Sequence, residues 1–69
     1  MQSRHIVTRA ARLRDFGLAQ AEIDRLKDAA QVSRLQEMPD EVVPLAHDYL
    51  DAAERRYGLP HVNYHADRA

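Results

Sequence analysis

The sequence predicts a small all-α domain of two to three helices, on the strength of three observations. Apolar residues recur at helical spacing in three separate stretches. Glycine or proline interrupts the chain at the ends of these stretches, at Gly17, Pro39 and Gly58. With 69 residues and no cysteine for disulfides, the core must be thin. We therefore expect a helical hairpin plus a C-terminal helix, one domain over residues 1–69, completed by homodimerisation.

The first helix is expected at residues 3–16. Ile6, Ala10 and Leu13 share one face of such a helix because its period is 3.6 residues. Another face carries basic and polar side chains: Arg4, His5, Thr8, Arg9 and Arg12. Gly17 is expected to end the helix, since glycine adopts the left-handed conformation without a steric penalty.

The second helix is expected at residues 20–37. Its apolar stripe is formed by Ile23, Leu26 and Ala30. In one continuous helix, three further apolar residues fall on roughly the opposite side: Val32, Leu35 and Met38. Alternatively, Ser33 begins a capping box and starts a separate short turn. We favour the continuous helix because this segment contains no glycine or proline.

The third helix is expected at residues 42–57. Pro44 is compatible with this start, because proline is tolerated in the first turn of a helix. The apolar residues of this helix cover an arc wider than one partner helix needs: Val42, Leu45, Ala46, Tyr49, Leu50, Ala53 and Tyr57. Residues 58–69 are expected to form an irregular tail, either anchored through Val62 and Tyr64 or mobile.

Charge is distributed unevenly along the chain, although the formal net charge is only −1. Residues 1–16 carry four arginines and one aspartate, a balance of +3, whereas residues 39–69 carry six acids and three arginines, a balance of −3. This asymmetry favours packing of the first helix near the last in a monomer, or antiparallel subunits in a dimer. Because no apolar stretch is long enough to span a bilayer, we expect a cytoplasmic protein that does not contact membranes.

The segment Leu13-Arg14-Asp15-Phe16-Gly17-Leu18, followed by a Glu-Ile pair at residues 22–23, resembles part of the MerR-type transcription regulators. In that family a helix ends in Gly-Leu or Gly-Phe at this place, and the next helix begins with a Glu-Ile pair. The resemblance covers only this helical corner. The family's helix-turn-helix precedes the corner and has no counterpart here, so no DNA-reading role carries over to these residues.

The sequence predicts neither catalytic residues nor a cofactor or metal site. It contains no cysteine nucleophile, and its two glycines, Gly17 and Gly58, cannot build a glycine-rich phosphate loop. His61 and His65 are four residues apart, a spacing that suits zinc on a helix, but Pro60 argues against a regular helix there. We therefore expect a protein without enzymatic activity and without a small-molecule substrate.

The excess apolar surface favours a protein-binding regulator of the inhibitor or adaptor type that binds a partner protein through its helices. Nearly all basic residues are arginines, which is typical of a GC-rich bacterial or phage genome, and an inhibitor or adaptor encoded by a phage or mobile element would fit this composition. The residues expected to contact the partner are Arg9, Arg12, Val32, Leu35, Met38, Tyr49 and Tyr57.

The alternative is a dimeric DNA-binding transcription regulator that presents the basic first helix of each subunit to nucleic acid. Its phosphate-contacting residues would be Arg4, Arg9 and Arg12. The sequence pI of about 6.4 lacks the overall basic signature of an autonomous DNA binder, which places this alternative second.

Overall fold

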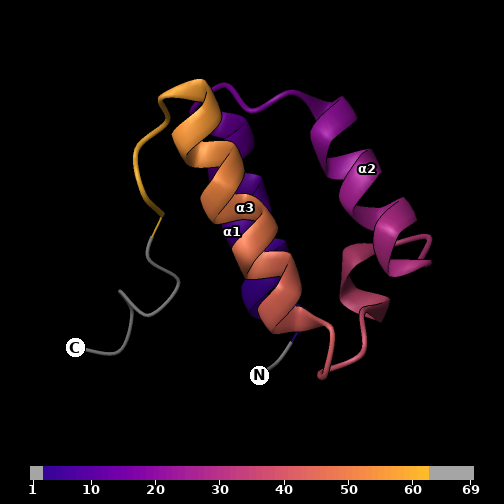
Figure 1. Ribbon diagram of the computed structural model, residues 1–69. Helices are drawn as coiled ribbons and strands as arrows, with labels where there is room; N and C mark the ends of the chain where they lie inside the picture. Colours follow the sequence, from indigo (N-terminus) through magenta and orange to yellow (C-terminus); the bar gives the residue numbers. More distant parts are fainter. Residues whose placement is uncertain (1–2, 63–69) are drawn as a thin grey trace.

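The computed structural model describes residues 3–62, which form three α-helices and one short 3₁₀ helix (Figure 1). In chain order the elements are α1 (Ser3–Asp15), α2 (Gln20–Ala30), η1 (Leu35–Glu37) and α3 (Val43–Tyr57). The prediction of an all-α domain is confirmed, and no strand occurs within residues 3–62. Over the same residues, no helix has the length and apolar character needed to cross a membrane.

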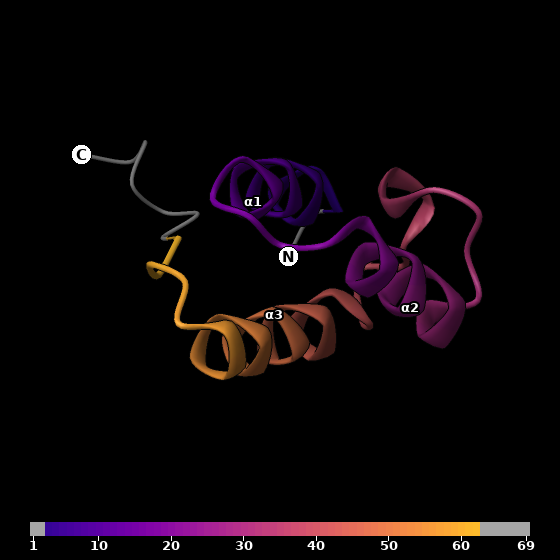
Figure 2. The ribbon, with the colours of Figure 1, turned by 90° about the horizontal axis from the view of Figure 1, so that it is seen from above.

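Helices α1 and α3 lie side by side and run in the same direction, while α2 packs against α3 (Figures 1 and 2). The main contacts of α1 are with η1 and α3 rather than with α2, so the predicted hairpin of the first two helices is not the packing unit. Ser3 Oγ donates a hydrogen bond of 2.9 Å to the Gln36 carbonyl and ties the start of α1 to η1. Packing of the first helix near the last, expected from the charge asymmetry, is confirmed.

The core is a single cluster of apolar side chains that all the helices and their connections share. Its members are Ile6, Ala10, Leu13, Leu18, Ile23, Leu26, Leu35, Met38, Val43, Ala46, Leu50, Ala53 and Val62. The three residues that the helical period placed on one face of α1 are all among them. This shared cluster orients the faces of α3, which carry the polar and apolar features described below.

Both glycines end helices, as predicted. Gly17 has φ of +115°, and the Leu18 N–H donates a hydrogen bond of 2.9 Å to the Leu13 carbonyl. Gly58 has φ of +65°, and Leu59 makes the equivalent bond, also 2.9 Å, at the end of α3. A left-handed residue followed by a bond to the carbonyl five residues back is the Schellman motif. The repeated glycine therefore marks a repeated helix stop.

Helix α2 ends at Ala30, so the prediction of one continuous helix over residues 20–37 is wrong. Gln31 adopts the left-handed conformation with φ of +59°, and the Val32 N–H donates a hydrogen bond of 3.0 Å to the Lys27 carbonyl. This is the same motif as at the two glycines, although glutamine has to bear the steric cost of the left-handed region. A helix stop without glycine or proline has no clear signal in the sequence.

After α2 the chain turns back into the core instead of extending. Leu35 and Met38 are buried and Val32 is half-buried, so these residues do not form the second exposed patch that a continuous helix would carry. The separate short turn considered as the alternative is present as η1. Its cap is Arg34, with no side-chain hydrogen bond, so Ser33 does not cap it.

Helix α3 begins at Val43, one residue later than predicted, with Pro44 in its first turn. Beyond the helix, the chain folds back so that Val62 is buried in the core. Of the two anchors considered for the tail, Val62 therefore packs against the domain, whereas Tyr64 lies outside the described residues.

Candidate functional site

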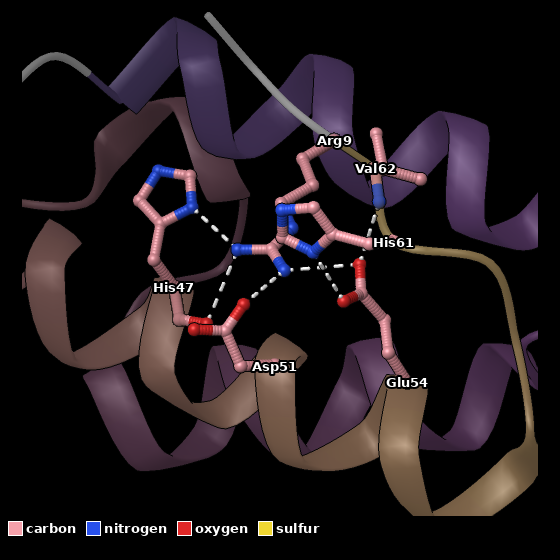
Figure 3. Close-up of polar contacts among 6 residues, drawn as sticks. All are labelled: Arg9, His47, Asp51, Glu54, His61 and Val62. Atoms are coloured by element: carbon pink, nitrogen blue, oxygen red, sulfur yellow. Dashed lines mark hydrogen bonds and ion pairs between the residues drawn. The ribbon is translucent and has the colours of Figure 1, made fainter.

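The face of α3 that meets α1 is polar, and we call it the polar face; it consists of His47, Asp51 and Glu54. Arg9 of α1 is only 1% exposed and extends its guanidinium across this face (Figure 3). Its Nη1 lies 2.9 Å from His47 Nδ1 and donates a hydrogen bond of 3.2 Å to the His47 carbonyl. Its Nη2 donates to Glu54 Oε2 at 3.0 Å and also to Asp51 Oδ1. One arginine thus binds three turns of α3.

Glu54 is the second residue of this cluster that contacts several partners. Besides Arg9, it accepts the Val62 N–H at 2.9 Å on Oε2, and His61 Nδ1 lies 2.8 Å from Oε1. Burial raises the pKa of Glu54, but the hydrogen bonds from Val62, His61 and Arg9 outweigh burial and leave it below the ordinary value of 4.5. The ionised carboxylate therefore fastens the end of the described chain to α3.

The contact with Arg9 assigns a hydrogen-bonding role to His47 Nδ1. A guanidinium can only donate hydrogen bonds, so His47 Nδ1 has to be the acceptor at 2.9 Å. The ring proton must then be on Nε2, and the imidazole is neutral in this arrangement. A protonated His47 would place a second positive charge against Arg9.

Three side chains here have the chemistry of metal ligands. Asp51, Glu54 and His61 offer oxygen and nitrogen atoms that all lie within 4.8 Å of one another. The Arg9 guanidinium already bonds both carboxylates, so the protein supplies the cation that balances them. A metal ion would compete with a buried positive charge for the same oxygens, and the geometry favours a structural ion-pair cluster.

A second buried carboxylate lies on the side of α3 that meets α2. Glu22 accepts a hydrogen bond of 2.6 Å from the Tyr49 hydroxyl, another from the Tyr57 hydroxyl, and one of 3.2 Å from Arg25 Nη1. Hydrogen bonds from Tyr49 and then Tyr57 are the main reasons why the pKa of Glu22 lies below its ordinary value of 4.5. Burial, and then the bond to Glu22, raises the pKa of Tyr49 above 10.0. The two tyrosines therefore join α3 to α2.

Next to this carboxylate, an apolar groove opens between α2 and α3. It encloses about 180 Å³ and is lined by Leu26, Ala29, Ala30, Val42, Leu45, Ala46 and Tyr49. A smaller hollow of about 60 Å³ continues it past Tyr49, lined also by Ala52 and Arg56. Leu45, one of these lining residues, is 67% exposed. We call the residues of α3 along this groove, Leu45, Tyr49, Ala52 and Arg56, the open face.

The structure moves several predicted partner-binding residues away from the surface. Arg9 is buried against α3, so its expected place on an exposed basic face is wrong, and the nucleic-acid alternative keeps only Arg4 and Arg12 as exposed side chains. Arg12 is exposed and also remains a candidate for the partner surface. The burial of Leu35 and Met38 removes both from that surface.

The remaining predicted residues keep a surface position in part. Val32 and Tyr49 are half-buried, and Tyr57 is exposed, although both tyrosine hydroxyls are bonded to Glu22. The sequence places Leu45 only within a wide apolar arc, yet Leu45 is the arc residue that the fold leaves most open to solvent. The width of that arc is the feature of the sequence that indicates an exposed apolar residue on this helix.

Comparison with models of protein families, with curated proteins and with solved structures finds no match to this chain.

Proposed function

We propose that the protein is a cytoplasmic, non-enzymatic regulator that binds other proteins through its helices and works as a homodimer. The observation that carries this proposal is the apolar α2–α3 groove with Leu45 exposed beside it. A leucine held in water is unfavourable, and a docked apolar surface would recover roughly 25 cal/mol for each Å² that it covers. The groove is therefore the surface that we assign to association.

The buried polar side chains support a non-enzymatic role. Arg9, His47 and Glu54 contact one another or the backbone of their own chain, and Glu22 is bonded to two tyrosines. These contacts join α1, α2 and α3 to each other. Since the same groups connect the helices, we assign them to the stability of the fold rather than to a reaction.

A second copy of the chain is the occupant that we assign to the groove. Leu45 and Ala52 lie equally far along α3 from a point between Asp48 and Tyr49, with the large side chain on one side of that point and the small one on the other. An antiparallel α3 of a second copy would place Leu45 against Ala52 of that copy, and the reverse contact would follow from two-fold symmetry. Ala52 is exposed and leaves room for the leucine.

The charges at the two ends of the open face are also complementary. Glu41 is exposed in the turn before α3, and Arg56 is exposed near the end of the helix. In the antiparallel arrangement, Glu41 of each copy approaches Arg56 of the other, so the symmetric interface contains this pair twice. A parallel arrangement would instead bring equal charges together at each end.

Light scattering over a range of concentrations tests the proposed homodimer. We expect the wild-type protein to dimerise at tens of micromolar, and the Leu45→Asp variant to remain monomeric because a carboxylate would be buried against apolar surface. Phe16→Asp is the matched control, since Phe16 is also exposed, at 53%, but lies outside the groove. A wild-type protein that stays monomeric, or equal losses in both variants, would contradict the proposal.

A further inference from the structure

A second hollow lies between α1, α2 and residues 33–36, away from the open face of α3. It encloses about 280 Å³. Three cationic side chains from three different segments line it: Arg14 of α1, Lys27 of α2 and Arg34 before η1. Among the described residues, none that lines this hollow is acidic. We call it the basic hollow; its charge is opposite in sign to the net charge of −1 of the whole chain.

The hollow exists because of the way the chain passes from α1 to α2. The Gly17 corner separates the two helices, and the Gln31 turn then directs η1 back to α1. On the α1 side, the hollow is lined by Ala10 and Ala11, whose small side chains leave the space open. Val7 also contributes to an apolar lining. The hollow therefore combines an apolar lining with a cationic rim.

The cations of the rim have only weak partners within the chain. Lys27 Nζ lies 3.3 Å from Asp24 Oδ1, and Arg34 Nε lies 3.8 Å from Glu37 Oε2. Both are ion pairs between neighbouring turns at the surface, and such pairs contribute little free energy. Arg14 acts on Asp24 through its charge, with no ion pair closer than 4.0 Å among the described residues. An external anion can therefore compete for all three cations at small cost.

We propose that the basic hollow binds an acidic segment of a partner protein, with carboxylates at Arg14, Lys27 and Arg34 and an apolar side chain between them. This inference rests on the proposed protein-binding function and names the chemistry of the partner. The apolar lining distinguishes a peptide from a free phosphate, because a phosphate ion has no apolar part to place against Val7 and Ala11. A carboxylate-rich segment with leucine or valine between its acids satisfies both parts of the hollow.

Fluorescence anisotropy with a labelled peptide of alternating glutamate and leucine tests the proposal at low salt. The variant Arg14→Gln/Lys27→Gln/Arg34→Gln should bind about tenfold more weakly or worse, since three ion pairs are lost together. The matched control is Arg4→Gln/Arg25→Gln/Arg55→Gln, which removes the same charge from exposed positions outside the hollow. We expect the control to bind within about twofold of the wild type.

A second variant tests the shape of the hollow without changing its charge. Ala11→Phe fills the open space from the exposed side of α1, and it should weaken peptide binding as the triple variant does. Inorganic pyrophosphate serves as a competitor that carries charge but no apolar part. We expect it to displace the peptide only at concentrations that screen all charges, as sodium chloride of the same ionic strength does.

Three results would overturn the proposal: equal weakening in the two triple variants, unchanged binding by Ala11→Phe, or displacement by pyrophosphate well below the ionic strength at which sodium chloride acts. The last result would assign the hollow to a phosphate ligand. Light scattering on the same samples separates this inference from the proposed homodimer, because the hollow variants leave the open face of α3 intact. Hollow variants that remain dimeric and no longer bind the peptide support both proposals.

Discussion

The two faces of α3 differ in whether their side chains are covered within the chain. The polar face is closed: Arg9 of α1 bonds His47, Asp51 and Glu54, and it is 1% exposed. The open face carries an apolar groove and leaves Leu45 67% exposed. One helix thus has its charged side chains paired within the chain on one side and leaves the apolar side chain of Leu45 uncovered on the other.

This difference assigns the polar face to the stability of the fold and the open face to association with another chain. Buried charges are costly unless they are paired, so the charged side chains of the polar face need partners within the chain. Exposed apolar groups are tolerated in a monomer and become favourable only when another surface covers them. Substitutions on the polar face should therefore change the free energy of unfolding, and substitutions on the open face should change association.

The largest effect on stability is expected for Arg9→Ala. This change leaves the buried Glu54 without its cationic partner, and breaking a buried ion pair typically costs about 3–5 kcal/mol. Urea unfolding of wild type and variant measures the loss. Arg12→Ala, three residues along α1 and exposed, is the control and should change the free energy by less than about 0.5 kcal/mol. A similar, small loss of unfolding free energy in both variants would contradict the structural role of the polar face.

Acid should weaken the fold through the two buried carboxylates. Glu22 and Glu54 have folded-state pKa values below the ordinary 4.5, so the unfolded chain takes up protons first as the pH falls. Their contribution is complete above about pH 4.5 and is lost as the pH falls through the lower folded-state values. Urea unfolding at pH 7, 5, 4 and 3 should show a decline confined to the acidic end. Glu54→Gln should make that decline shallower, and an unchanged slope would contradict the role given to Glu54.

Much of the fold follows from local patterns in the sequence. The helical period of Ile6, Ala10 and Leu13 identifies the buried side of α1, and the glycine ending α1 fixes where that helix stops. The charge asymmetry between the two ends of the chain indicates that the first helix packs near the last. These features depend on neighbouring residues or on summed charge, which a sequence displays directly.

The candidate sites depend on tertiary contacts, and the sequence does not display these. Arg9 lies on the basic side of its helix, and only the approach of α3 turns it from a surface residue into a buried one. Its partners do carry a pattern, because His47, Asp51 and Glu54 are spaced four and three residues apart and share one side of α3. Gln31 carries no such pattern, and its left-handed conformation accompanies a tertiary contact, the return of η1 to α1.

Replacement of Gln31 by glycine tests whether the α2 stop directs Leu35 and Met38 to the core. Glycine avoids the steric cost of the left-handed conformation, so Gln31→Gly should raise the free energy of unfolding by about 0.5–1 kcal/mol. In a continuous helix the same change would lower it by a similar amount. The sign of the change in the free energy of unfolding, measured with urea, therefore decides between the two structures. A destabilised variant would support the continuous helix, which carries a second apolar patch.

The smallest effect on stability is expected on the open face. Leu45→Ala should alter the free energy of unfolding by less than about 0.5 kcal/mol when measured on dilute, monomeric protein. Leu50→Ala, in the same helix but at 0% exposure, should cost about 2–5 kcal/mol because it leaves a cavity in the core. Comparable losses in the two variants would mean that Leu45 is covered within the monomer.

Charge reversal tests most directly whether the open face of α3 pairs with itself in an antiparallel dimer. Glu41→Arg alone sets two pairs of like charges against each other, and Arg56→Glu alone does the same with the opposite sign. Each variant should dimerise about tenfold more weakly than the wild type or worse.

Mixing the two variants restores opposite charges at both ends of the interface, because Arg replaces Glu41 in one chain and Glu replaces Arg56 in the other. Sedimentation velocity on the mixture should therefore show a heterodimer at a concentration where each variant alone is monomeric. A mixture that stays monomeric under conditions where the wild type dimerises would contradict the antiparallel pairing of α3.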